Sequence, residues 1–350
     1  MGFALPQLIA TDLDGTLLTP QHTVTKRTTA ALRKLQQQFG VKIVLASGRS
    51  PRSVQKVIDN LNDNKGNNES ENSNLSNGNN NFANFESNEF LFVPDAVLCC
   101  NGALTFDPLS KQISNPRFIS LDAAITAVRR LRSLVDTSSN LANAAFACEV
   151  VWIDDNCDKE ASKYSSDTFF VCDKQWKLYR SDAIYYKHTV AEDSFESFLE
   201  SLKLPDGRLR GGVIKLMALD KTKTAAQLYD SLPQDMKPVS PSEKNQNITP
   251  DADLAVTYSG PYFLEVAAAG VSKGLGLELL CTSLDIKREN IVAFGDLLND
   301  AEMLQFAGQG LCMGNGHPDM KKLADRVIGT NTEEGVAEEI ESWFRYIIPE

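Results

Sequence analysis

Short apolar segments alternate with segments of helical periodicity at the start of the chain, and this alternation limits the fold more than any other feature. The apolar segments are QLIATD, VKIVLAS and DAVLCCNGA, at 7–12, 41–47 and 95–103. A helical pattern at 25–39 ends at Gly40, and Ser50 with Pro51 begins a second helix. Uniformly apolar strands that alternate with helices predict a Rossmann-like parallel sheet of the α/β class, covered on both faces.

The same alternation returns near the C-terminus, whereas the middle of the chain is patterned differently. Predicted strands outnumber helices in the middle and lie close together, which favours a mostly antiparallel sheet with helices on one side. These strands are predicted at 111–119, 146–153, 168–172, 183–188, 213–220 and 254–259. A length of 350 residues fits two domains. We therefore predict an α/β core domain at 1–107 and 269–350, and an inserted α+β domain at 108–268.

One segment within the first α/β part has a composition unlike the rest. Residues 62–89 are mainly Asn, Ser, Glu and Gly. A segment with so little apolar area cannot offset the entropy lost on ordering. We therefore predict a disordered insertion at the surface.

The charge and the cysteine content narrow the class of protein. A net charge of -11 and a pI near 4.9 argue against nucleic acid or an anionic membrane as the main partner, but they allow a small anionic substrate. No apolar run approaches the roughly 20 residues that span a bilayer. The first strand begins near Leu8, which leaves no room for a signal peptide. Seven cysteines without a C-x-x-C pair indicate a reducing compartment, so we expect a cytoplasmic protein of unknown oligomeric state.

Two carboxylates follow the first apolar strand, in LIATDLDGTLL. Asp12 and Asp14 project to the same side if the extended backbone persists. Like charges this close repel each other, and a divalent cation such as Mg²⁺ removes that conflict. The carboxyl ends of strands are also the edge where ligands bind in open α/β sheets. The alternative is a simple turn, since Asp-Gly is a common turn dipeptide, and these residues alone do not decide between the two.

A second acidic group follows a later strand, in IVAFGDLLNDAEML. Asp296, Asn299 and Asp300 come directly after its apolar run. Asp300 could simply cap the following helix, whereas Asp296 precedes the helix. A third acidic oxygen from a neighbouring strand end is what a magnesium site requires.

Candidate phosphate ligands lie at two other element ends. Ser47 combines a hydroxyl with backbone amides at a strand-to-helix turn. Lys273 begins a helix, where a cation costs about 0.3–1 kcal/mol unless an anion lies in front of it. A solvated surface lysine is the alternative. Lys215, in the predicted strand VIKLMALD, is a candidate substrate contact, although a strand lysine usually faces solvent.

These motifs together resemble one known family. DLDGTLL, SGR, CNGA, GVSKG, GDLLND and MGN occur in the order and at the spacings of the haloacid dehalogenase superfamily, and the chain is most similar to its Cof-type phosphatases with a type IIB cap. The resemblance covers nearly the whole chain apart from the Asn-rich segment and some middle loops. It implies that the inserted domain is a mobile cap that selects the substrate.

The resemblance also implies roles for individual residues. Asp12 corresponds to the nucleophile, Asp14 to the acid/base residue, and Lys273 to a phosphoryl-binding catalytic residue. Mg²⁺ would be held by Asp12, the backbone carbonyl of Asp14, and Asp296, with Asp300 supporting the metal. The remaining phosphate- or substrate-binding positions implied are Ser47, Gly48, Arg49, Asn101 and Asn299. Ser47 stands where threonine is commoner, and two leucines in GDLLND stand where glycine or polar residues are usual.

The expected function is therefore a Mg²⁺-dependent phosphatase that hydrolyses small phosphorylated metabolites through an aspartyl-phosphate, with sugar phosphates as the first candidates. A phosphotransferase or phosphomutase would use the same aspartyl-phosphate. A third alternative is a descendant that binds a ligand without turnover.

Overall fold

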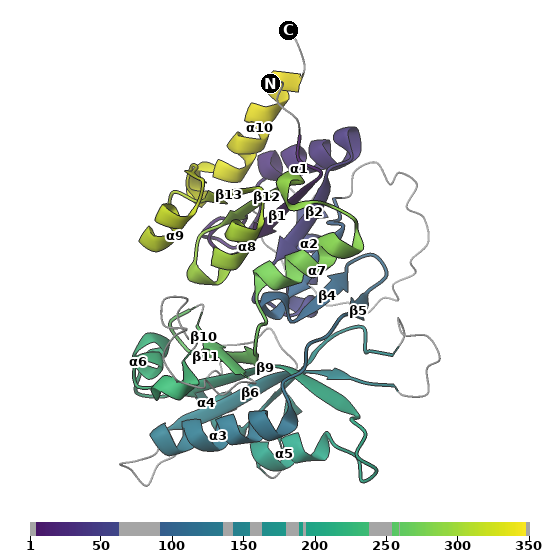
Figure 1. The fold of residues 1–350 in the computed structure, drawn as a ribbon. Helices are drawn as coiled ribbons and strands as arrows, with labels where there is room; N and C mark the ends of the chain where they lie inside the picture. Colours follow the sequence, from purple (N-terminus) through teal and green to yellow (C-terminus); the bar gives the residue numbers. More distant parts are fainter. Residues whose placement is uncertain are drawn as a thin grey trace, which may run out of the picture.

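The computed structural model describes residues 5–62, 92–135, 143–154, 163–179, 189–191, 194–237, 254–258 and 260–347. Within these ranges the chain forms two separate sheets, which lie one above the other in Figure 1. The predicted Asn-rich insertion, apart from Asn62, and the predicted strand at 183–188 lie outside the described residues.

The larger sheet confirms the predicted α/β core. Its strand order is β14-β13-β12-β1-β2-β3-β4-β5, and every pair from β14 to β3 is parallel. The bounds are β1 (Leu8–Asp12), β2 (Lys42–Ala46), β3 (Ala96–Cys99), β4 (Leu104–Asp107), β5 (Gln112–Ser114), β12 (Ile291–Gly295), β13 (Gln309–Cys312) and β14 (Arg326–Val327). β4 and β5 extend one edge as antiparallel strands.

Helices cover both faces of this sheet. Successive residues of β1 show why, because Ile9 packs into one apolar cluster while Leu8 and Ala10 pack into the opposite one. The first cluster is closed by α1 (Lys26–Phe39), α2 (Pro51–Asn62) and α10 (Gly335–Ile347). The second is closed by α7 (Lys273–Ser283), α8 (Ala301–Phe306) and α9 (Pro318–Leu323). Of these helices, α10 has no counterpart in the sequence prediction.

The smaller sheet has the order β10-β11-β9-β6-β7-β8, and its neighbours are antiparallel except for β7 and β8. The bounds are β6 (Ala144–Trp152), β7 (Phe169–Cys172), β8 (Thr189–Val190), β9 (Gly211–Asp220), β10 (Leu254–Thr257) and β11 (Leu264–Ala268). Helices α3 (Leu121–Val135) and α5 (Phe195–Ser201) lie on the side that faces away from the larger sheet (Figure 1). Helix α6 (Ala225–Asp230) contributes Leu228 to the same apolar cluster.

Two details of the predicted middle region are wrong. The strand predicted at 111–119 is shorter, and as β5 it pairs with β4 of the larger sheet, while Ile119 forms a single bridge to Val213 of β9. The helices are also not confined to one side, because Trp176 of α4 (Lys174–Tyr179) packs with Phe170 and Met217 on the opposite face. The apolar pattern of a short strand does not show which sheet it joins, because that depends on the strand with which it pairs.

Candidate functional site

Four neighbouring parallel strands bring the predicted motifs to one edge of the larger sheet. β1 ends at Asp12, β12 ends just before Asp296, β2 ends just before Ser47, and β3 leads through the 3-10 turn η2 (Cys100–Gly102) to Asn101. Because the strands are parallel, their carboxyl ends share an edge, which is where open α/β sheets bind ligands. The strand register therefore gathers residues that are far apart in the sequence.

Lys273 is the centre of the cluster at this edge. Its side chain is 1% exposed, although it begins α7 after the capping residue Ser272. The ammonium Nζ lies 2.5 Å from Asp12 Oδ1 and 2.7 Å from Asp300 Oδ1. The alternative of a solvated surface lysine is therefore wrong. A buried ammonium persists because two carboxylates compensate for its lost hydration.

Asp300 does not cap the helix that follows it. Its Oδ2 accepts hydrogen bonds from the backbone amides of Asp296, at 3.0 Å, and Leu297, at 3.1 Å, while its Oδ1 contacts Lys273. No side-chain bond caps α8 at this position, although Asp300 is the residue before that helix. The carboxylate instead fixes the turn that presents Asp296 and holds Lys273 in place.

Asp296 approaches the turn after β1. Its Oδ1 accepts a hydrogen bond of 3.0 Å from Thr16 Oγ1. Gly15 has φ +88, and a Cβ at that position would lie 2.2 Å from Asp296 Oδ2. Both the left-handed conformation and the close approach require glycine. The glycine of the DLDGT motif therefore allows the two acidic segments to meet.

The three buried carboxylates form a suitable donor set for a divalent cation. Among the described residues, Asp12, Asp296 and Asp300 each offer an oxygen within 4.8 Å of the others. Burial raises the pKa of Asp12 well above its usual range, and burial followed by the charge of Asp300 raises the pKa of Asp296 to about 6. Lys273 is the one cation in the described part of the chain that contacts these carboxylates, so two negative charges remain uncompensated when all three are ionised. All-oxygen donors with excess negative charge fit Mg²⁺.

Asp14 has different partners from Asp12. β1 ends at Asp12, so the extended backbone does not persist to Asp14, which lies in the following turn. Arg49 binds the Asp14 carboxylate in a bidentate pair, with Nε at 2.7 Å from Oδ2 and Nη2 at 2.5 Å from Oδ1. His22 Nδ1 lies 3.4 Å from Asp14 Oδ1. The two carboxylates of the motif are therefore held by separate cations.

The loop after β2 places three predicted residues side by side. Ser47 is buried, and its Oγ accepts a hydrogen bond of 3.2 Å from the backbone amide of Arg49. The backbone amide of Asn101 donates to the Ser47 carbonyl at 2.9 Å. The carbonyl of Gly48 accepts from Lys215 of β9 at 2.9 Å. The Ser47 loop therefore contacts both the η2 turn and the smaller sheet.

Asn101 and Asn299 join the same network. Asn299 Nδ2 donates to Asn101 Oδ1 at 3.2 Å, and Asn101 Nδ2 donates to Glu265 Oε2 of β11 at 3.2 Å. Sequence reasoning missed Glu265, and the expectation that Lys215 faces solvent is wrong because both side chains are buried. The one available signal was the pair of charged residues inside apolar strands, VIKLMALD and LEVAA.

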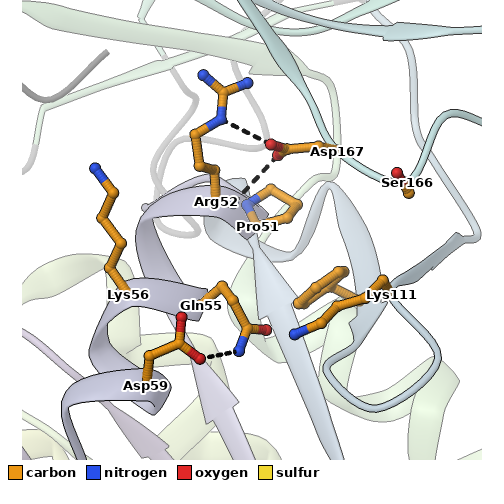
Figure 2. A pocket seen from close by; sticks show the side chains of 9 residues that line it. Pro51, Arg52, Gln55, Lys56, Asp59, Lys111, Ser166 and Asp167 are labelled. Atoms are coloured by element: carbon orange, nitrogen blue, oxygen red, sulfur yellow. Dashed lines mark hydrogen bonds and ion pairs between the residues drawn. The ribbon is translucent and has the colours of Figure 1, made fainter. Parts of the chain in front are cut away.

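A pocket on the surface lies beside this edge and contains none of the predicted site residues. It is lined by α2, by Phe106 and Lys111 of the larger-sheet region, and by Ser166 and Asp167 before β7 (Figure 2). Arg52 Nε lies 2.7 Å from Asp167 Oδ2, and the Arg52 amide donates to Asp167 Oδ1 at 3.2 Å. This pair is a further contact between the two sheet regions.

Known proteins resemble this chain over nearly its whole length. A family model described as haloacid dehalogenase-like hydrolase matches residues 9–89 and 75–340. Phosphatase YwpJ of Bacillus subtilis (strain 168) is 26% identical over 334 residues, which cover 95% of this chain and 97% of that protein. Pyridoxal phosphate phosphatase YbhA of Escherichia coli (strain K12) is 24% identical, with coverage of 96% and 98%.

A solved structure supports the fold. The structure of a sugar phosphatase of haloacid dehalogenase subclass IIB has a TM-score of 0.59 and 16% identity to this chain, with 97% of this chain and 99% of that chain covered. A separate finding is that no helix among the described residues is long and apolar enough to cross a membrane.

Proposed function

We propose a function from the premise that the chain belongs to the haloacid dehalogenase-like hydrolase family. The protein is a phosphoric monoester hydrolase, and we propose that it depends on Mg²⁺ and acts on small phosphorylated metabolites through an aspartyl-phosphate. The observation that carries the proposal is the buried contact between Asp12 and Lys273 at the carboxyl edge of the larger sheet. A carboxylate at such an edge can attack an anion only if cations neutralise the approaching charge, and Lys273 is already in place to do so.

The proposed reaction has two steps. In the first, a carboxylate oxygen of Asp12 attacks phosphorus, the bond from phosphorus to the ester oxygen breaks, and Asp14 donates a proton to that leaving oxygen. In the second, Asp14 takes a proton from water, whose oxygen attacks phosphorus and releases inorganic phosphate and the free Asp12 carboxylate. Atoms and charge balance, and no oxidant or co-substrate other than water is needed.

Arg49 imposes a condition on this cycle. The bidentate pair with Arg49 occupies both oxygens of the Asp14 carboxylate, which must reach the leaving oxygen in the first step and water in the second. Proton donation in the first step requires Arg49 to move away from Asp14. We therefore propose that Arg49 exchanges Asp14 for the anionic substrate when the substrate enters.

The phosphoryl group would be bound by residues on three sides. Lys273 supplies a fixed positive charge, and Ser47 with the Gly48 and Arg49 backbone supplies uncharged donors. Asp12, the backbone carbonyl of Asp14, and Asp296 would hold Mg²⁺, with Asp300 orienting Asp296 and Lys273. The metal would neutralise charge on the phosphoryl oxygens. Asn101 and Asn299 complete the proposed binding residues.

We propose that the residues between the two halves of the larger sheet act as the cap. They correspond to the inserted domain that the sequence predicts at 108–268. The smaller sheet supports this proposal, because its face without α3 and α5 is turned toward the larger sheet (Figure 1). β5 lies in the larger sheet, so the cap would begin after Ser114. Sugar phosphates are the first substrate class that we propose.

The test is a turnover screen of the full-length protein against a panel of phosphorylated metabolites with Mg²⁺. We expect phosphate release that stops when the metal is chelated and returns when Mg²⁺ is added back. Product analysis by ³¹P NMR separates hydrolysis from transfer, because a transferase or mutase forms a new phosphate ester instead of free phosphate. Activity that is indifferent to chelator would refute the metal dependence, and absence of both products would refute the enzymatic proposal.

A further inference from the structure

The face of the smaller sheet that is turned toward the larger sheet carries a buried ion pair in contact with the Ser47 loop. Lys215 of β9 and Glu265 of β11 are both buried, and Lys215 Nζ lies 2.7 Å from Glu265 Oε1. Both side chains lie on the face opposite α3 and α5, because their neighbours Leu216, Leu264 and Val266 point into the cluster under those helices. The pair is therefore aimed at the larger sheet.

The adjoining strand adds a third charged residue. Glu149 of β6 is the register partner of Lys215, and Glu149 is also buried. Burial lowers the pKa of Lys215, but the charge and hydrogen bond of Glu265 together with the charges of neighbouring groups such as Glu149 more than reverse that effect, and the pKa is above its ordinary value. Lys215 is therefore a permanent cation, and it is not a group that releases its proton near neutral pH.

The contact with Gly48 has a geometric consequence for the Ser47 loop. A trans peptide is planar, so the carbonyl of Gly48 and the amide of Arg49, which belong to one peptide unit, point in opposite directions. Lys215 Nζ binds that carbonyl at 2.9 Å, and the amide at the other end of the unit donates to Ser47 Oγ at 3.2 Å. The cation holds the orientation of the peptide and polarises its N–H toward Ser47.

The other half of the ion pair reaches the opposite side of the site. Glu265 Oε2 accepts from Asn101 Nδ2, and Asn101 Oδ1 accepts from Asn299 Nδ2, each at 3.2 Å. Asn299 is the residue before Asp300, which contacts Lys273. The Lys215–Glu265 pair thus contacts both the Ser47 loop and the Asn101 turn from a separate sheet.

We propose that Lys215, held by Glu265, is the positioning residue through which the smaller sheet orients the Gly48–Arg49 peptide to bind the phosphoryl anion. The inference rests on the proposed function, and it adds that phosphate affinity depends on a residue outside the larger sheet. Lys215 touches a backbone carbonyl and a carboxylate, so its effect passes through the loop. Lys215 is not proposed to contact the leaving group of the substrate.

The experiment compares Lys215→Met with the double variant Lys215→Met/Glu265→Gln in the full-length protein. The double variant removes both charges of the pair with little change of shape, so it avoids leaving the Glu265 carboxylate without its cation if the single variant does not fold. Inorganic phosphate is the probe, and its dissociation constant is measured by calorimetry in the presence of Mg²⁺. We expect the dissociation constant and the KM for a small aryl phosphate to rise about tenfold, because a charge-assisted hydrogen bond to the loop is lost.

Lys223→Met is the matched control. Lys223 pairs with Asp220 at the end of the same strand at 3.7 Å, and its removal should leave phosphate binding within about twofold of the wild type. Arginine at position 215 keeps the charge and donors, so Lys215→Arg should recover part of the affinity. An unaltered phosphate dissociation constant in the folded double variant overturns the positioning role. A wild type that neither binds phosphate nor hydrolyses any ester refutes the proposed function instead.

Discussion

Two lysines are buried among the residues that the structure describes, and both contact residues at the carboxyl edge of the larger sheet. Lys273 begins α7, which packs on the larger sheet, and contacts two carboxylates, Asp12 and Asp300. Lys215 lies within a strand of the smaller sheet and contacts one carboxylate, Glu265, and one carbonyl, that of Gly48. In both cases burial acts to lower the lysine pKa, and the neighbouring carboxylates more than reverse that effect.

The difference lies in what each ion pair leaves unsatisfied. The carboxylates around Lys273 outnumber it, and with Asp296 in their ionised forms they retain negative charge that a bound metal cation would neutralise. Glu265 divides its oxygens between Lys215 and Asn101, so this pair forms a bridge between two regions. A buried cation can thus either leave a site that needs a metal or join two parts of a molecule. The number of carboxylates in contact with it decides which.

The largest effect is expected from Asp12→Asn. The substitution removes the proposed nucleophile, and kcat should fall by more than about 10³-fold because no other group can form the covalent intermediate. Lys273 retains Asp300 as a partner, so the thermal midpoint should stay within a few degrees of the wild type. Steady-state kinetics and calorimetric melting check both statements. Retained turnover in a folded protein would contradict the assignment of Asp12.

The two lysines can be compared directly by the same substitution. Lys273→Met should lower kcat by about 10²–10³-fold, because it removes a cation that contacts the proposed nucleophile Asp12. Lys215→Met should act mainly on KM, since its contact is with the backbone of the loop. Parallel measurement of kcat and KM for both variants tests the distinction. A larger loss of kcat in Lys215→Met than in Lys273→Met would reverse the proposed division of roles.

A smaller effect is expected from Gly15→Ala, which tests the acidic cluster without changing a charge. The added Cβ would lie 2.2 Å from Asp296 Oδ2, so Asp296 must shift. The apparent affinity for Mg²⁺ should fall by about 10–100-fold, as is usual when the support of a metal ligand is lost. Activity titrated against Mg²⁺ measures this affinity.

Gly207→Ala is the control for backbone strain alone. Gly207 has φ +89, close to the +88 of Gly15, but a Cβ there would meet nothing within 4 Å. If both variants lose Mg²⁺ affinity equally, the effect comes from general destabilisation and not from displacement of Asp296.

The smallest effect is expected at the Arg52–Asp167 contact between the two sheet regions. Arg52→Gln removes the ion pair with Asp167. The side chains of Arg52 and Asp167 are 28% and 30% exposed. Ion pairs with this degree of solvent contact contribute about 1 kcal/mol or less to the free energy of unfolding. Urea denaturation should show that small loss, with phosphate binding unchanged. A weakening of phosphate binding as large as that of Lys215→Met would show that the two contacts are not distinct.

Sequence patterns predicted the larger sheet well because its local chemistry is distinctive. Strands buried on both faces must be uniformly apolar, and each β-strand of this kind is followed by a polar motif at its carboxyl end. Gly40 at the end of α1 has the left-handed conformation expected of a helix stop. The motifs also predicted which segments meet at the edge, since parallel strands end on the same side. The placement of Asp12, Lys273, Asp296 and Asp300 in one cluster agrees with that prediction.

Other features depend on contacts that a local pattern does not encode. β5 joins the larger sheet because β4 is beside it, and its short apolar sequence would suit either sheet. Asp300 has the sequence position of a helix cap, yet tertiary contacts direct its carboxylate to Lys273 and to the amides before it. Lys215 has the sequence of a solvent-facing strand residue and is buried because the larger sheet covers that face. Sequence determines which residues are polar and where strands end, since both follow from local side-chain chemistry. Only the tertiary structure decides which charges become neighbours, because burial and pairing depend on distant parts of the chain.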